Sequence, residues 1–198
     1  MRILNLYAGI GGNRKLWGNE HDITAVEINP DIANIYRDFF PGDKVIVADA
    51  HQYLLEHFKE FDFIWSSPPC PSHSDIRRCA VHAGRYGAIY PEMSLYQEII
   101  LLKHFALKTT QYAIENVIPY YKPLIEGQKI ERHLFWSNFN IAPFKNQNRR
   151  RHQDIVGSSN VYGFTISKYR IKNKRKILRN CVNPELGKHV LDYVKKSL

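Results

Sequence analysis

Short apolar runs alternate with segments of helical period over residues 1–136, and this alternation constrains the fold more than any other feature. Within the segments between the runs, one helix is predicted to begin at Asn29-Pro30-Asp31 and another to cover residues 92–107. Strands that alternate with helices indicate an α/β fold with a largely parallel sheet, which binds ligands at the carboxyl ends of its strands. The predicted strands are Ile3–Tyr7, Ile23–Glu27, Lys44–Val47, Phe61–Trp65, Tyr112–Glu115 and His133–Trp136.

Two parts of the chain depart from this alternation. Residues 66–90 contain several Pro and Gly and show little periodicity, so a long loop is predicted there. Residues 138–179 become polar and basic, as expected of a small insertion, and residues 180–198 are predicted to end in a closing helix. The predicted organisation is therefore a first unit over residues 1–137, the basic insertion, and a C-terminal segment that returns to the first unit.

The net charge of +9 is concentrated in one part of the chain. Residues 145–179 contain eleven basic side chains and one acid, Asp154, so this segment carries the whole excess. A local excess of this kind indicates a surface that binds a polyanion, and a solvated basic face is an equal alternative from composition alone.

The three cysteines form no C-x-x-C pair, so neither a disulfide scaffold nor a zinc site of the usual spacing is expected. The chain begins without a secretory pattern, and no apolar run approaches the roughly 20 residues of a membrane span. We therefore expect a soluble, cytoplasmic protein with no metal and no membrane partner.

A glycine-rich turn, Tyr7-Ala8-Gly9-Ile10-Gly11-Gly12, follows the first predicted strand. Glycines at a strand-to-helix turn let the backbone approach a ligand closely, although an ordinary tight turn is the alternative. Glu27 ends the second strand, where a carboxylate can bind both hydroxyls of a ribose, and Asp49 ends the third, where an adenine amino group would lie. Together these features favour a nucleoside cofactor, with an NAD site still open.

Chemistry-bearing residues also follow the fourth and fifth strands. Cys70 lies between Pro69 and Pro71, and prolines stiffen the backbone at a turn. A thiol there can act as a nucleophile if its pKa is lowered, and a buried structural cysteine is the alternative. Glu115-Asn116 ends the fifth strand, where a carboxyl group could hydrogen-bond a ring nitrogen of a heterocycle.

The ordered set of glycine turn, Pro69-Cys70 and Glu115-Asn116-Val117 resembles the cytosine-5 DNA methyltransferase family over residues 3–136 and about 180–198. The resemblance implies a Rossmann-like sheet of the S-adenosylmethionine-dependent methyltransferase type, with S-adenosylmethionine as cofactor and a small basic C-terminal insertion. The residues that it implies for cofactor binding are Tyr7, Ala8, Gly9, Ile10, Gly11, Gly12, Glu27, Ile28, Asp49, Ala50, Pro69, Leu95, Asn180 and Val182.

The same resemblance implies roles for four catalytic residues: Cys70 adds to C6 of cytosine, Glu115 binds or protonates N3, Arg132 holds O2, and Asn116 supports the turn. Arg132 ends an element that begins at Gln128, in which Ile130 replaces the first arginine of the family. A competing placement of this element ends at Arg151, but a polar segment follows it, so Arg132 is preferred.

The resemblance further implies that double-stranded DNA is the substrate and that the target base is flipped out of the helix. The short basic insertion leaves little room for sequence readout, so a protein partner or a homodimer is a further expectation. The residues expected to contact DNA are Arg77, Arg78, Arg85, Arg149, Arg150, Arg151, Lys172, Lys174, Arg175 and Lys176.

Three alternatives remain open on the sequence. Related catalytic motifs would serve RNA, so an RNA cytosine-5 methyltransferase is one of them. A catalytically impaired DNA-binding module is the second, because Pro71 and Ile130 both depart from the family pattern. An amino-methyltransferase is the third, although Cys70 together with Glu115-Asn116-Val117 argues against it.

Overall fold

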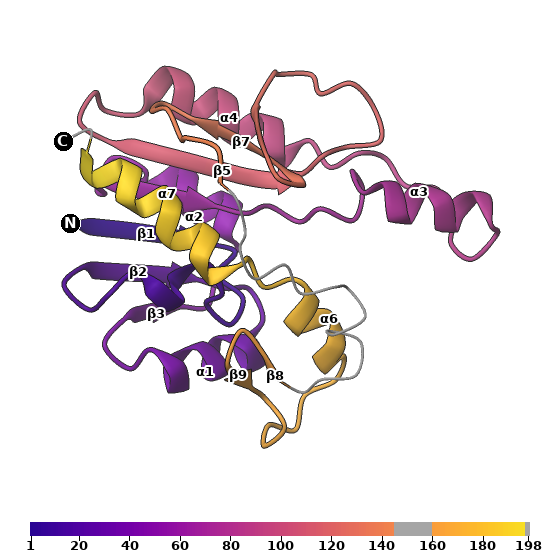
Figure 1. The fold of residues 1–198 in the computed structure, drawn as a ribbon, viewed down its shortest axis with the longest axis horizontal. Coiled ribbons are helices and arrows are strands. Elements are labelled where there is room, and N and C mark those ends of the chain that lie inside the picture. Colours follow the sequence, from indigo (N-terminus) through magenta and orange to yellow (C-terminus); the bar gives the residue numbers. More distant parts are fainter. Residues whose placement is uncertain (145–159, 197–198) are drawn as a thin grey trace.

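The computed structural model describes residues 1–144 and 160–196, and a seven-stranded sheet forms the centre of this part of the chain (Figure 1). The strand order is β3-β2-β1-β4-β5-β7-β6. The first five strands are parallel, and β7 runs antiparallel to both of its neighbours. The predicted α/β, Rossmann-like fold class is confirmed. The strands are β1 (Arg2–Leu6), β2 (Asp22–Val26), β3 (Lys44–Ile46), β4 (Phe63–Ser66), β5 (Gln111–Val117), β6 (Gln128–Ile130) and β7 (His133–Ser137).

The predicted helices are also present. The first is α1 (Pro30–Phe39), where the Asn29 side chain accepts hydrogen bonds from the N–H groups of Asp31 and Ile32 and Pro30 occupies the first turn. The segment predicted as a helix over residues 92–107 forms α4 (Ser94–Phe105). The closing helix is α7 (Pro184–Lys196).

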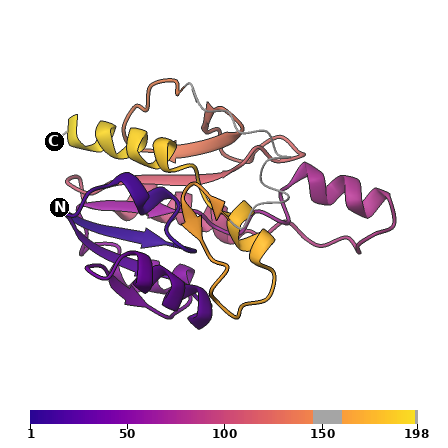
Figure 2. The ribbon, with the colours of Figure 1, turned by 60° about the horizontal axis from the view of Figure 1, so that its bottom comes forward.

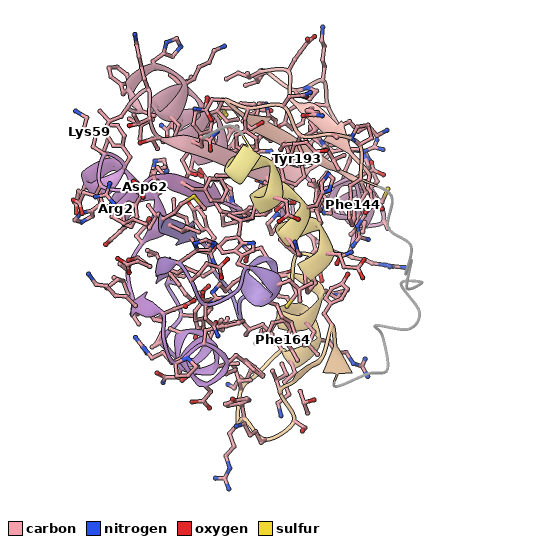
Figure 3. All side chains as sticks on the ribbon, turned by 60° about the vertical axis from the view of Figure 1, so that its left-hand side comes forward. Arg2, Lys59, Asp62, Phe144, Phe164 and Tyr193 are labelled. Carbon is pink, nitrogen blue, oxygen red and sulfur yellow. The ribbon has the colours of Figure 1, made fainter. Side chains whose placement is uncertain are left out.

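Helices cover both faces of the sheet. On one face, α2 (Ala50–His57) and α4 pack against alternate residues of β1, β4 and β5 in the largest apolar cluster. On the other face lie α1, the 3-10 helix η1 (Asn13–Leu16) and α7, which crosses the sheet at the front of Figure 1. Figure 3 labels Tyr193 on α7 and Phe144 beside this helix, and both belong to the apolar cluster of this face.

The contact between α7 and η1 depends on a glycine. A Cβ atom at Gly187 would overlap the backbone of Asn13, so only a glycine lets the two helices approach this closely. The Trp17 indole also donates a hydrogen bond of 3.1 Å to the Gly187 carbonyl. The C-terminal helix is thereby fixed against the first turn of the chain.

The segment predicted as a long loop, residues 66–90, contains a helix, so that prediction is wrong over α3 (Asp75–His82). None of the eight residues of α3, all of which the structure describes, is buried. Its apolar residues at helical spacing, Ile76, Cys79 and Ala80, cover little more than one turn, so they give only a weak helical signal among polar, Pro and Gly residues. In Figures 1 and 2, α3 stands away from the body of the molecule, beyond the carboxyl ends of the parallel strands.

The described part of the basic insertion contains β8 (Asn160–Val161), β9 (Phe164–Thr165) and the short helix α6 (Lys174–Arg179). Phe164, Leu178 and Ile166 are buried against Ile10 of the glycine turn and Ile35 of α1. The insertion thus packs on the α1 side of the sheet, next to the glycine turn. No helix within residues 1–144 and 160–196 is long and apolar enough to span a membrane.

Candidate active site

The glycine turn after β1 is shaped by close contacts on one side and by open space on the other. Gly9 and Gly11 have positive φ angles of 56° and 85°, which glycine adopts without strain. A Cβ atom at Gly11 would overlap the Phe40 ring, and one at Gly12 would lie 2.6 Å from the Val182 carbonyl oxygen. At Gly9, by contrast, a Cβ atom would meet no described atom within 4 Å. The turn therefore presents its open side at Gly9.

The residues expected to bind a cofactor fall into two groups around this turn. Ala8, Ile10, Ala50 and Leu95 are buried in the apolar clusters, where they support the turn and α2. Pro69 and Asn180 are exposed, whereas Tyr7 and Val182 are half-buried. The contact between Gly12 and Val182 shows that the C-terminal segment reaches the glycine turn, as the sequence predicts.

Glu27 lies at the end of β2 with its carboxylate fixed by the backbone. One oxygen accepts the N–H of Gly9 at 3.0 Å, and the other accepts the N–H of Asn29 at 2.9 Å. Each carboxylate oxygen has two lone pairs, so each retains one for a ligand hydroxyl. The neighbouring Ile28 is 66% exposed and offers an apolar surface beside this carboxylate. Carboxylate oxygens can accept hydrogen bonds from ribose hydroxyls, and an exposed apolar side chain can contact the face of a flat base.

Asp49, which the sequence predicts to contact an adenine amino group, is also the N-cap residue of α2. Its Oδ1 atom accepts hydrogen bonds from the N–H groups of His51 and Gln52, at 2.8 and 3.1 Å, and so caps α2. The Oδ2 atom is then the oxygen through which Asp49 would reach an adenine amino group.

Cys70 and Glu115 are brought together at the carboxyl ends of β4 and β5. The Cys70 carbonyl accepts the N–H groups of His73 and Ser74, so the thiol lies on a hydrogen-bonded turn. Burial raises the pKa of the Cys70 thiol, and the charge of Glu115 raises it further. The ammonium of Lys176, in α6, acts in the opposite direction and lowers this pKa.

Asn116 links the two strand ends. Its side chain is buried, and its Nδ2 donates a 3.0 Å hydrogen bond to the Pro68 carbonyl in the turn that carries Cys70. The Asn116 Oδ1 accepts the N–H of Val117 at 2.9 Å. These bonds hold the turn that carries Cys70 against β5.

Arg132 lies exposed in the two-residue turn between β6 and β7. Since β7 runs antiparallel to β5, this turn reaches the edge of the sheet where β5 ends. Ile130, which stands where the family has its first arginine, is buried in the apolar cluster beneath α7. An arginine at this position would bury its charge, which accounts for the departure.

Glu98 of α4 is a central buried residue of this edge that sequence reasoning missed. Its carboxylate accepts hydrogen bonds of 2.6 Å from Tyr7 and from Ser66, and the ring of His51 lies 3.0 Å away. It therefore joins the glycine turn, the end of β4 and the start of α2. Glu98 carries no sequence signal of its own, because it lies within the apolar periodicity of α4.

The hydrogen bond to Glu98 raises the pKa of His51 above its ordinary value of 6.5, despite partial burial. This contribution to stability is present at pH values below 6.5 and is lost as the pH rises through the pKa of the folded state. We expect an NMR titration of the His51 ring to give a midpoint above 6.5, which Glu98→Gln lowers. An unchanged midpoint in Glu98→Gln would contradict the assignment to Glu98.

The burial of Cys70 predicts its reactivity as a free thiol. Because its pKa is raised, little thiolate is present at pH 7, so we expect iodoacetamide to alkylate Cys70 more slowly than the exposed Cys79. The rate at Cys70 should rise with pH, and Lys176→Gln should slow it further. Mass spectrometry of both sites in one sample gives the comparison. Faster alkylation of Cys70 in Lys176→Gln would contradict the electrostatic effect.

Several of the residues expected to contact DNA are engaged within the protein. Arg78 pairs with Asp75 at 2.6 Å, and Arg77 lies 4.5 Å above the Tyr86 ring. Lys174 donates a 2.8 Å hydrogen bond to the Ser167 carbonyl. The exposed members of the set are Arg78, Arg85, Lys172, Arg175 and Lys176, whereas Arg149, Arg150 and Arg151 lie outside the described residues.

The strand order with an antiparallel β7, the glycine turn and the carboxylate at the end of β2 define an S-adenosylmethionine-dependent methyltransferase. Residues 1–117 match the family described as C-5 cytosine-specific DNA methylase. The chain belongs to this family, so it is a cytosine methyltransferase with S-adenosylmethionine as cofactor. In the described residues, no group of three or more His, Cys, Asp or Glu could hold a metal ion.

Similar solved structures have low sequence identity and TM-scores below 0.5. A hypothetical protein of Thermus thermophilus is 16% identical, with 69% of this chain and 73% of that chain covered and a TM-score of 0.46. A TehB-like methyltransferase of Corynebacterium glutamicum is 17% identical, with coverages of 59% and 54% and a TM-score of 0.37. Spodoptera frugiperda DNMT2 is 22% identical, with coverages of 59% of this chain and 35% of that chain and a TM-score of 0.39. No curated protein matches the chain.

Proposed function

We propose that this protein methylates carbon 5 of cytosine in double-stranded DNA through a covalent bond between Cys70 and C6 of a flipped base. The observation that carries the proposal is the juxtaposition of Cys70 and Glu115 at adjacent strand ends, close enough for the carboxylate to affect the thiol pKa. The family match over residues 1–117 includes both residues.

S-adenosylmethionine supplies the methyl group as an electrophilic carbon. The residues that would hold it are the glycine turn with its open side at Gly9, the carboxylate of Glu27 and the exposed surface of Ile28. Asp49 adds a second carboxylate at the end of β3.

Cytosine C5 is a weak nucleophile, and the role of Cys70 is to make it a stronger one. The Cys70 thiolate forms a bond to C6, and the electron pair of the C5–C6 double bond moves toward C5 and the N3–O2 side of the ring. A carboxyl proton of Glu115 at N3 and the guanidinium of Arg132 at O2 stabilise this charge. After methylation, loss of the C5 proton restores the double bond and releases the thiolate.

The target atoms lie inside a duplex, so the base must leave the stack at a cost of a few kcal/mol. The α3 arm, which we define as residues 72–90, extends beyond the edge of the sheet that carries Cys70 (Figure 2). Its exposed Arg85, with Lys172 and Arg175 of the insertion, provides cations for phosphate contacts. We therefore propose that DNA binds along this edge, with the α3 arm closing over the flipped base.

The test is the transfer of a labelled methyl group from S-adenosylmethionine to duplex DNA, with an RNA transcript of the same sequences in parallel. Chromatography of the hydrolysed product is expected to give 5-methylcytosine from DNA. A label found in RNA and not in DNA would show that RNA is the substrate, and the proposal would then be wrong about the polymer. Binding of DNA without transfer to either polymer would favour a DNA-binding module and overturn the enzymatic function.

A further inference from the structure

A histidine lies beside the carboxylate of Glu115. In the antiparallel ladder of β5 and β7, His133 faces Val117 and Phe135 faces Glu115. Alternate residues of a strand point to the same side of a sheet, so Glu115 and His133 lie diagonally on one face. The distance from His133 Nε2 to Glu115 Oε1 is 3.6 Å.

Both side chains are largely shielded from water, with 17% of His133 and 9% of Glu115 exposed. Within the described residues, Nδ1 of His133 is buried without a hydrogen-bond partner. Glu115 is therefore the polar group toward which the imidazole is directed. At 3.6 Å this contact is longer than a hydrogen bond, and burying a polar ring without hydrogen bonds is costly, which indicates a function for the nitrogen that faces Glu115.

Among the described residues, titratable and charged groups on three neighbouring elements lie near this end of the sheet. Cys70 lies on the turn after β4, and Lys176 of α6 acts on the same thiol. Arg132 and Glu131 occupy the turn that leads into β7.

We propose that His133 is a positioning residue: when substrate binds, its contact with Glu115 shortens to a hydrogen bond from Nε2–H to Oε1, which directs the other carboxyl oxygen toward N3 of the base. This inference rests on the proposed function. When the Cys70–C6 bond forms, the Glu115 carboxyl proton moves to N3 and Glu115 becomes a carboxylate. The hydrogen bond from His133 then becomes charge-assisted and stronger, so it stabilises the transition state more than the ground state. When the thiolate leaves, the proton returns from N3 to Glu115.

The experiment compares three variants of the full chain by their kcat and KM with duplex DNA. His133→Leu is expected to lower kcat about 10- to 100-fold, the lower part of the range for a positioned acid, with unchanged cofactor affinity. His133→Gln keeps an N–H donor, so its kcat at pH 8 should remain within about threefold of the wild type. The exposed His104→Gln, on α4, is the matched control and should behave as the wild type.

Rescue by the conservative variant separates this role from a structural one. His133→Gln should be faster than His133→Leu, while the KM for DNA and the cofactor affinity should be the same in both variants. If His133→Leu is as active as the wild type, or if His133→Gln is as slow as His133→Leu, the inference is wrong. Should His133→Leu fail to fold, His133→Gln decides alone, and a kcat lowered by much more than about threefold would overturn the inference. An inactive wild type would instead overturn the proposed function.

Discussion

Replacing Cys70 with serine is expected to lower methyl transfer by at least about 10³-fold, because a serine hydroxyl is a far poorer nucleophile than a thiolate. Cofactor affinity should not change, since the turn that carries Cys70 is held by Asn116 and by backbone hydrogen bonds. Tritium transfer from labelled S-adenosylmethionine to DNA measures the first quantity, and isothermal titration measures the second.

The matched control is Cys79→Ser, which changes an exposed cysteine of α3 and should retain full activity. DNA containing 5-fluorocytosine adds a covalent readout, because fluorine at C5 cannot leave as a proton and the adduct persists. A stable protein–DNA adduct is expected from the wild type and from Cys79→Ser. An adduct formed by Cys70→Ser would eliminate Cys70 as the nucleophile.

The second large effect concerns stability. Asp43→Asn is expected to lower the free energy of unfolding by about 3–5 kcal/mol, because it leaves the buried guanidinium of Arg14 without its counter-charge. Both side chains are 4% exposed and are joined by hydrogen bonds of 2.8 and 3.0 Å. Tyr36 donates a third bond to the same carboxylate at 2.7 Å. Urea denaturation followed by circular dichroism gives the measurement.

An exposed ion pair provides the control for this prediction. Lys188 and Asp192 pair on the surface of α7, with side chains 51% and 43% exposed. Lys188→Gln should therefore change the free energy of unfolding by less than about 1 kcal/mol. A loss of similar size in both variants would show that burial does not determine the strength of the Arg14–Asp43 pair.

Elements with an apolar face could be predicted from the sequence, and those without one could not. The strands β1, β4 and β5 alternate or run apolar through the core, and α1 has both a capping Asn29 and a buried stripe. By contrast, α2 buries only Ala50 and Leu54, and no residue of α3 is buried. Each of these helices has only eight residues and few apolar side chains at helical spacing, so the hydrophobic period available for prediction is short.

Some residues of the candidate site could likewise be predicted from the sequence, and others could not. Cys70, Glu115 and the glycine turn occupy strand ends and form recognisable motifs, so the sequence was sufficient to predict them. Glu98 and His133 could not be predicted, because each lies inside an element whose pattern is apolar. Each contacts a residue that only the fold brings close, Ser66 for Glu98 and Glu115 for His133. Pairing register and helix packing, which determine those contacts, are not encoded in short motifs.

The contact between η1 and α7 joins parts of the chain that are separated by 170 positions, as the bond from Trp17 to Gly187 shows. During synthesis on the ribosome, the first strands emerge long before the helix that covers them. One face of the sheet, with Ile3 and Trp65, therefore stays exposed to solvent until the last helix is made. Such late closure slows folding and exposes apolar surface to chaperones and to neighbouring nascent chains.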